Sequence, residues 1–246
     1  MKEKIVSFIW QHLLLLISLF IMTLGVAICV RSNFGSSVIS SIPFVMTLAG
    51  EAAKAPRFTI GEYTYIMNIV LVFGQFLILR RRFEPVQLLQ LIIGFVFGFL
   101  LDVNMALSSF LNCESLFSQI GAQVAGCIIL GIGIALEIRC GSVTMPGEGF
   151  PAAISKYSGM PFPKAKIIVD ISLVVIAVIL GFVYFHGWLW NVIGPGTLFA
   201  MFFVGVVVKF LHNRLGWFDR LLAYRPGFRR YLFGLARFLK NNSIMP

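Results

Sequence analysis

Six stretches of this chain, each at least 15 residues long, contain no Asp, Glu, Lys or Arg, and they constrain the fold more than any other feature. A helix that spans a membrane needs about 20 mostly apolar residues. With their flanking residues all six stretches reach that length, so the sequence predicts six transmembrane helices. The stretches are residues 13–30, 63–79, 85–101, 115–136, 171–185 and 189–208.

The composition agrees with a membrane protein. Hydrophobic residues make up 59% of the chain and charged residues 12%, whereas a soluble domain carries about 25% charged residues. The mean hydropathy is +0.92. These values exclude an ordinary soluble globular protein.

The distribution of basic residues predicts the orientation of the helices. Of the 20 Lys and Arg residues, 17 lie in the N-terminal segment, the second and fourth connections and the C-terminal tail, which all fall on one side of the membrane. Because basic residues accumulate on the cytoplasmic side, both termini are expected to be cytoplasmic. The net charge of +10 then calls for anionic lipid as a partner, and for no nucleic acid.

The sequence contains a weak internal repeat. At an offset of 106, Leu24 and Gly25 fall on Leu130 and Gly131, and the Gly-Ser pair at 35–36 falls on the one at 141–142. With small gaps Asn68 then falls on Asp170, and Asp102 on Lys209. The matches predict one three-helix unit written twice, in repeats of about 13–107 and 116–211.

A unit of three helices enters the membrane from the opposite side when it is repeated. The predicted fold is therefore an all-α polytopic membrane protein with six transmembrane helices in a 3+3 inverted-topology repeat, as in many secondary transporters. The membrane domain would span residues 1–215. Residues 216–246 interleave aromatic and basic residues, which is typical of an amphipathic cytoplasmic tail on anionic lipid, with partner docking as the alternative.

Short apolar segments follow the first and fourth helices, at residues 38–49 and 150–157. Both are too short to span a bilayer, so re-entrant or interfacial segments are expected. Pro43, Pro146, Gly147 and Gly149 are expected to interrupt regular helix there. Irregular backbone at membrane depth survives where it lines a cavity.

The two Gly-Ser turns before these segments are the candidate solute site. The amino end of a short helix suits a polar or anionic group, and hydroxyl and guanidinium groups would add donors. The candidate substrate-binding residues are Arg31, Gly35, Ser36, Ser37, Arg139, Gly141, Ser142 and Thr144. Two alternatives remain open: the arginines snorkel at helix ends, and the glycines only end helices.

Three further residues are candidates for coupling or gating. Asp170 and its counterpart Asn68 are polar residues in apolar helices, where ionisable groups are costly and commonly functional. Glu148 is either a gate or a loop carboxylate. Asp170 also has a simpler interpretation, because Lys166 lies four residues before it and the two can pair on one helix.

Other polar and small residues have structural interpretations. Glu137 is expected to be structural, and Asp102 and Lys209 interfacial. The glycines expected at helix contacts are Gly94, Gly98, Gly131, Gly133 and Gly205. Four cysteines without metal-ligand spacing predict free thiols, and no enzyme motif occurs, so no enzyme, cofactor or metal site is expected.

The double pattern of "LG" late in a helix, a "GS" turn, and the Gly-rich helix "GFVFGFLLD" resembles the YczE/YyaS/YitT family of bacterial integral membrane proteins, in its YczE-like branch. The resemblance covers roughly residues 15 to 215. It implies a bacterial cytoplasmic membrane location and a transporter-like activity. The expected function is movement of a small polar or anionic solute; the alternative is a non-transporting scaffold or regulator of a partner protein. Self-association into a homo-oligomer is left open.

Overall fold

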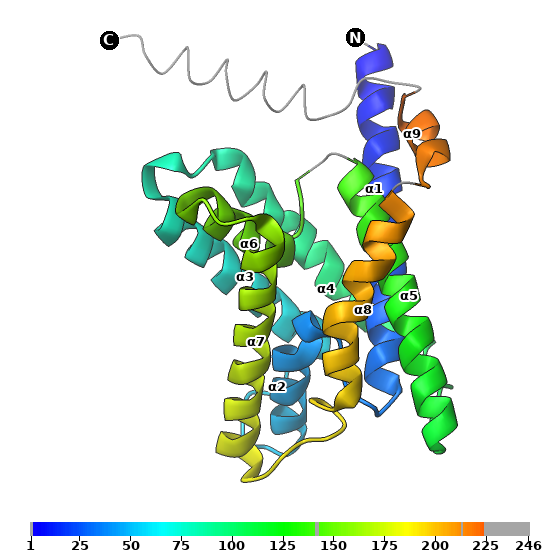
Figure 1. Cartoon of the computed structure of the whole chain (residues 1–246), viewed down its shortest axis with the longest axis vertical. Coiled ribbons are helices and arrows are strands. Elements are labelled where there is room, and N and C mark those ends of the chain that lie inside the picture. Colours follow the sequence, from blue (N-terminus) through cyan, green and yellow to red (C-terminus); the bar gives the residue numbers. More distant parts are fainter. Residues whose placement is uncertain (1, 141–142, 213, 224–246) are drawn as a thin grey trace.

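The computed structural model describes residues 2–140, 143–212 and 214–223, and within these ranges the chain forms helices without β-strands (Figure 1). The α-helices are α1 (Lys2–Arg31), α2 (Ser41–Glu51), α3 (Ile60–Leu79), α4 (Leu89–Leu107), α5 (Leu116–Cys140), α6 (Pro146–Ser158), α7 (Phe162–Phe185), α8 (Pro195–His212) and α9 (Gly216–Ala223). Short 3-10 helices are η1 (Val38–Ser40), η2 (Arg80–Arg82) and η3 (Pro85–Leu88).

Five helical segments of the described chain are long and apolar enough to cross a membrane. These segments are Trp10–Arg31, Ile60–Leu79, Pro85–Leu107, Leu116–Cys140 and Phe162–Phe185. Large apolar side chains also cover outward surfaces; Val70, Phe99 and Phe117, for example, are 62%, 62% and 90% exposed. Because a soluble monomer rarely exposes so much apolar surface, the chain is a multi-pass membrane protein.

The sixth predicted stretch, residues 189–208, is only partly helical. Its first residues form a turn in which Trp188 Nε1 donates to the Ile193 carbonyl at 2.8 Å, and α8 begins at Pro195, where proline suits the first helical position. The apolar part of α8, Pro195–Leu211, is shorter than the five spans. In contrast, α7 begins nine residues before the predicted stretch 171–185, since it accommodates Lys164 and Lys166.

The residues expected to interrupt regular helix within or beside the short segments have different outcomes. Pro43 and Gly149 do not interrupt the helices that contain them, α2 and α6, whereas Pro146 and Gly147 stand at the start of α6. Proline is tolerated in a first turn because the N–H that it lacks has no helical partner there. The segments observed, Val38–Glu51 and Pro146–Ser158, contain the predicted ranges, and the first of them begins with the 3-10 turn Val38–Ser40.

The helices pack in two groups. The first group consists of α1, α4, α5 and α8, whose buried side chains include Val26, Phe97 and Leu130. The second group consists of α2, α3, α6 and α7, with Val45 and Leu173 in its core. Helices α3 and α4 pack along each other and join the groups. Each group therefore takes helices from both halves of the chain.

Helices α1 and α5 form an antiparallel pair at the centre of the first group. Ser18 Oγ lies 3.8 Å from Cys140 Sγ, and Ser32 Oγ, beyond the other end of α1, donates to Gln123 Oε1 at 2.8 Å. The residue numbers rise along α1 while they fall along α5. The first turn after α1 and the turn after α5 therefore lie at opposite ends of this pair.

Four of the five glycines predicted at helix contacts are confirmed. A Cβ atom on Gly94, Gly98, Gly131 or Gly133 would come within 3.1 Å of an atom of a neighbouring helix. The prediction for Gly205 is wrong, because a Cβ there would meet nothing within 4 Å. Close backbone approach at small residues is the usual way in which helices pack within lipid.

The predicted free thiols are confirmed for the four cysteines, Cys29, Cys113, Cys127 and Cys140.

The first part of the predicted C-terminal tail forms helix α9. Trp10 Nε1 on α1 donates to the Leu221 carbonyl of this helix at 3.2 Å. Helix α9 therefore lies against α1 (Figure 1). Residues 224–246 lie outside the described residues.

Candidate functional site

The first Gly-Ser turn is built into the contact with the start of α8. The backbone N–H and the hydroxyl of Ser36 both donate to the Val192 carbonyl at 2.9 Å, and the N–H of Gly196 donates to the Phe34 carbonyl at 3.0 Å. Gly35 has φ +137°, and a Cβ there would lie 2.7 Å from the N and Oγ1 atoms of Thr197. Glycine is therefore required at this turn for both its conformation and its size.

The other polar groups of this turn bond within the chain. The Ser37 and Ser40 hydroxyls lie 2.7 Å apart, and the Ser41 hydroxyl donates to the Val38 carbonyl at 2.7 Å. Arg31 Nη2 donates to the Met105 carbonyl at 3.0 Å. Several groups predicted to bind a solute at this turn are thus bonded internally, whereas Arg31 Nε is buried without a hydrogen-bond partner among the described residues.

The second Gly-Ser pair, Gly141 and Ser142, lies outside the described residues. Cys140 and the part-buried Thr144 flank it, and Arg139 at the end of α5 is engaged in contacts. Cys140 lies beside Ser18, which is fourteen residues from Ser32, a distance of about 20 Å at 1.5 Å per helical residue. The end of α5 and the residues that follow α1 are therefore at opposite ends of the α1–α5 pair.

What the structure does bring together is the starts of the two short helices. A Cβ on Gly147, at the start of α6, would overlap the Cδ1 atom of Ile39 in η1. The segment η1 also contacts α7 and α8, and α6 contacts α3 and α7. The amino ends of α2 and α6 therefore approach each other inside the molecule.

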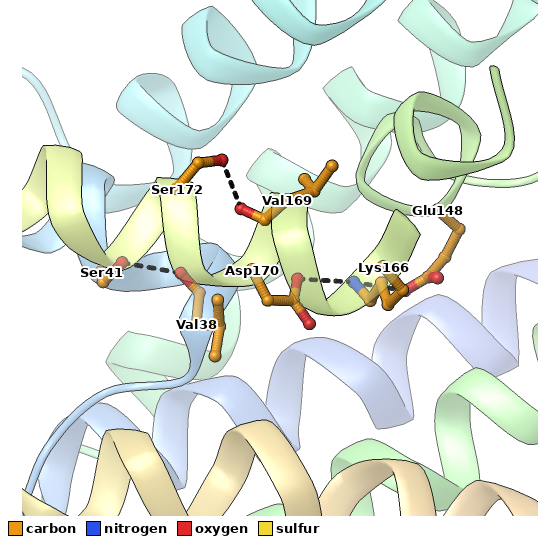
Figure 2. Close-up of polar contacts among 7 residues, drawn as sticks. All are labelled: Val38, Ser41, Glu148, Lys166, Val169, Asp170 and Ser172. Carbon is orange, nitrogen blue, oxygen red and sulfur yellow. Dashed lines mark hydrogen bonds and ion pairs between the residues drawn. The ribbon is translucent and has the colours of Figure 1, made fainter. Parts of the chain in front are cut away.

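Helix α2 runs along only part of α7. Figure 2 shows Val38 and Ser41, at its start, beside Asp170, which is nine residues into the 24-residue helix α7. Beyond the other end of α2, Lys54 Nζ donates to the Tyr184 carbonyl at 2.6 Å, near the end of α7. Helix α2 thus begins near the middle of α7 and runs back to one end.

A cluster of four charged residues lies where the short helices meet α7. Lys166 Nζ lies 3.2 Å from Glu148 Oε1 and 3.0 Å from Asp170 Oδ1 (Figure 2). The side chains of Glu148 and Asp170 are only 17% and 11% exposed. Glu137, 2% exposed on α5, is within electrostatic range of Glu148 and Lys166. We refer to these four residues as the Lys166 cluster.

Glu137 also fixes the start of α6. Its Oε1 atom accepts a hydrogen bond from the Met145 backbone N–H at 2.8 Å, and Met145 is the N-cap residue of α6. A carboxylate at this position satisfies an orphan amide and opposes the positive end of the helix dipole. The predicted structural role of Glu137 is confirmed, and the anion at this helix end is the chain's own carboxylate.

Asn68 makes no hydrogen bond with Asp170, its predicted counterpart. It is fully buried on α3 against Gly94 of α4, and neither its side-chain nitrogen nor its oxygen has a hydrogen-bond partner among the described residues. Two turns further along α3, Gln75 Nε2 donates to Gln90 Oε1 at 2.8 Å. Asn68 therefore belongs to a buried amide row between α3 and α4.

Asp102 is also anchored, at the opposite end of the α3–α4 pair from Gln75 and Gln90. Its Oδ1 atom accepts from the Gly61 N–H at 2.8 Å, and its Oδ2 atom accepts from the Thr59 hydroxyl at 2.6 Å. These contacts hold the first turn of α3.

Sequence reasoning identified Glu148 and Asp170 but did not assign Lys166 to a site. The i, i+4 spacing predicted the contact between Lys166 and Asp170, and the structure confirms it. The second contact, to Glu148, joins α6 to α7 and has no local sequence signal. The spacing of Glu137 from Met145 likewise becomes informative only once the start of α6 is known.

Comparison with protein-family models matches residues 9–213 to a family of unknown function, DUF6198. The comparisons with curated proteins and with solved structures gave no match. The family match covers more than half of the chain, including α2 through α8 and the whole Lys166 cluster. This multi-pass membrane protein therefore belongs to DUF6198.

Proposed function

We propose that this protein is a secondary-transporter-like membrane protein that moves a small polar or anionic solute. The observation that carries the proposal is the meeting of the α2 and α6 starts, at Ile39 and Gly147, beside the buried Lys166 cluster. Secondary transporters place their sites where broken or short helices from two repeats meet near the bilayer midplane. Costly buried charges in such a place are commonly functional.

The packing of the helices supports a 3+3 inverted repeat. If α1 to α4 correspond to α5 to α8 in order, then the contact of α1 with α4 corresponds to that of α5 with α8, and both are made. The contacts of α2 with α3 and with α7 likewise correspond to those of α6 with α7 and with α3. The antiparallel α1–α5 pair maps onto itself. In this scheme α8 is the sixth spanning helix, and α2 and α6 are re-entrant.

One contact departs from this symmetry. Helices α3 and α4 pack closely, whereas the corresponding α7 and α8 do not pack along each other in this way. In alternating-access transport one repeat rocks or gates against the other. In any one conformation of such a cycle, the α3–α4 contact and the corresponding α7–α8 contact would be unequal.

The finer assignment and the orientation are part of the same proposal. The glycine and Gly-Ser patterns support membership of the YczE-like branch of the YczE/YyaS/YitT family. The basic-residue distribution supports cytoplasmic termini in a bacterial cytoplasmic membrane, with the basic tail on anionic lipid. The side of α9 would then be cytoplasmic, and the turn at Gly35 would face outward.

The charge of the cluster limits how an anionic solute would bind. The cluster contains three carboxylates and one ammonium group, so a bare anion near Glu148 and Asp170 would be repelled. A neutral polar solute, or an anion accompanied by a positive charge, fits better. This requirement favours coupled over simple facilitated movement.

The test is flux through the purified full-length protein in liposomes. We expect at least one small solute from a panel of amino acids, carboxylates, phosphate and sulfate to produce protein-dependent uptake under a proton or sodium gradient. Asp170→Asn is expected to reduce that uptake, while Lys156→Gln, which changes an ion pair that is 52% exposed on both sides, leaves it unchanged. Absence of uptake for the whole panel would favour the scaffold alternative.

A further inference from the structure

We propose that the Lys166 cluster binds one monovalent positive charge, a proton or an alkali cation, and that Lys166 acts as the tethered counter-ion which this charge displaces. As a coupling site this inference rests on the proposed transport function. Binding itself does not depend on transport. The proposal extends the predicted pair of coupling residues to Lys166 and Glu137.

The first argument is the excess of negative charge. Glu148 and Asp170 share a single ammonium group, at 3.2 Å and 3.0 Å, so these two carboxylates carry one more negative charge than Lys166 compensates. Buried charges are tolerated when they are paired, and an unpaired one is very costly. One Lys166 ammonium compensates one carboxylate, so the cluster has an affinity for additional positive charge.

The second argument is independent of the ion pairs and comes from Glu137. This side chain is 2% exposed; its Oε1 atom bonds the Met145 N–H, while its Oε2 atom has no hydrogen-bond partner among the described residues. A buried oxygen without a donor calls for a proton or a cation. The unsatisfied acceptor thus lies at the start of α6, the helix whose first turn carries Glu148.

The surroundings favour a single charge rather than a divalent metal. In the part of the chain that the structure describes, no three His, Cys, Asp or Glu side chains are arranged to hold a metal ion, so the carboxylates of the site are the two that flank Lys166, Glu148 and Asp170. Glu137 on α5 lies beside the start of α6, and Arg139, two residues further along α5, has contacts of its own. The start of α2 places the Ser41 hydroxyl and the Val38 carbonyl near α7 (Figure 2).

Lys166 is suited to be displaced. Its ammonium group sits on a flexible four-carbon stem, and its side chain is 27% exposed, so it has a path out of the cluster. Its two contacts join α6 to α7. Binding of a cation by Glu148 and Asp170 would release this connection, which links occupancy of the site to the relative position of the two helices.

The experiment measures thermal unfolding of the purified full-length chain in detergent. The melting temperature is compared in NaCl, KCl and choline chloride at equal ionic strength, each at pH 6 and pH 9. If an alkali ion is the ligand, Na⁺ or K⁺ is expected to raise the melting temperature over choline by about 5 °C at 100 times its Kd. If the proton is the ligand, the three salts give equal values and the rise accompanies the change from pH 9 to pH 6.

Three variants locate the effect. Asp170→Asn is expected to abolish the cation- or proton-dependent rise, and Glu148→Gln serves if that variant does not fold. Lys166→Gln removes the tethered competitor. If an alkali ion is the ligand, this variant is expected to lower the cation concentration of half-maximal effect at least tenfold. If the proton is the ligand, it is expected to raise the pH of half-maximal effect by at least one unit. Lys156→Gln, from the exposed pair with Glu84 at 3.5 Å, is the matched control and is expected to behave as wild type.

The outcomes separate this inference from the proposed function. Equal responses of wild type and the Asp170 or Glu148 variant to all salts and both pH values would overturn the cation site, as would an unchanged midpoint in folded Lys166→Gln. A cation-dependent shift without any solute flux would leave the site standing and remove the transport proposal. Solute flux without a cation- or proton-dependent shift would remove the cation site and leave the transport proposal standing.

Discussion

The antiparallel α1–α5 pair predicts a large effect for the smallest side-chain change, Gly25→Ala. A Cβ at Gly25 would overlap the backbone nitrogen of Leu130 and lie 2.7 Å from its Cα atom and 2.8 Å from the Gly126 carbonyl oxygen. These are backbone atoms, so no side chain can rotate away. Restoring normal contact distances requires α1 and α5 to separate by about 1 Å along a tightly packed face.

The expected cost follows from overpacking, which destabilises by about 1–3 kcal/mol. The matched control is Gly205→Ala on α8, where a Cβ would meet nothing within 4 Å and the change gains helix propensity of up to about 1 kcal/mol. Thermal unfolding in detergent is expected to rank Gly205→Ala at or above wild type and Gly25→Ala several degrees below it. Equal melting temperatures for the two variants would refute the close packing of α1 on α5.

The remaining predictions concern the orientation and the first turn. Membrane-impermeant thiol reagents added to intact cells are expected to label single cysteines introduced at Asn112 and Trp188, and not at Arg81; labelling at Arg81 would reverse the proposed orientation. Gly35→Ala is expected to lower the unfolding free energy by at least about 1 kcal/mol, because the residue has φ +137°, a conformation that is strained for alanine. An unaffected melting temperature would contradict this strain. Ser36→Ala loses a buried hydrogen bond to Val192 and is expected to lower it by about 1 kcal/mol without changing solute uptake; reduced uptake at normal stability would return Ser36 to the solute site.

The sequence was sufficient for the helices whose ends coincide with charges. The charge-free stretches 13–30, 63–79 and 85–101 lie within the segments α1, α3 and η3 with α4, and 115–136 lies within α5 except for its first residue. The start of α7 was missed because the search stopped at charged residues, and α7 carries Lys164, Lys166 and Asp170 in its first half. Lys166 and Asp170 are tolerated there because they pair with each other. Lys166 also pairs with Glu148, a contact between two helices that no local pattern encodes.

The site was harder to predict because turns and helix starts separate in space. The Gly-Ser turns look equivalent in sequence, yet the first is occupied by hydrogen bonds to the segment 192–197. The helices that follow the turns approach each other at Ile39 and Gly147. Glycine spacing reports close backbone contacts, and it does not report which polar atoms are already satisfied by distant parts of the chain.

Under the proposed repeat, corresponding positions share small residues but differ in charge. Asn68 corresponds to Asp170, and at the offset of 106 Arg31 corresponds to Glu137. Arg31 donates to a carbonyl of α4, whereas Glu137 accepts from the start of α6. The neutral Asn68 packs between α3 and α4, while Asp170 binds Lys166.

These differences place the charged chemistry in the second half of the chain. The carboxylates of the Lys166 cluster come from α5, α6 and α7, and the first half faces this cluster with neutral groups at the start of α2. An exactly symmetric protein would have the same affinity for a charge from either half, and its two arrangements would be equivalent. With the Lys166 ion pairs in the second half only, binding of a positive charge would act directly on the connection between α6 and α7, whereas α2 and α3 have no corresponding ion pair among the described residues. Such a difference is required for a ligand to favour one of two arrangements over the other.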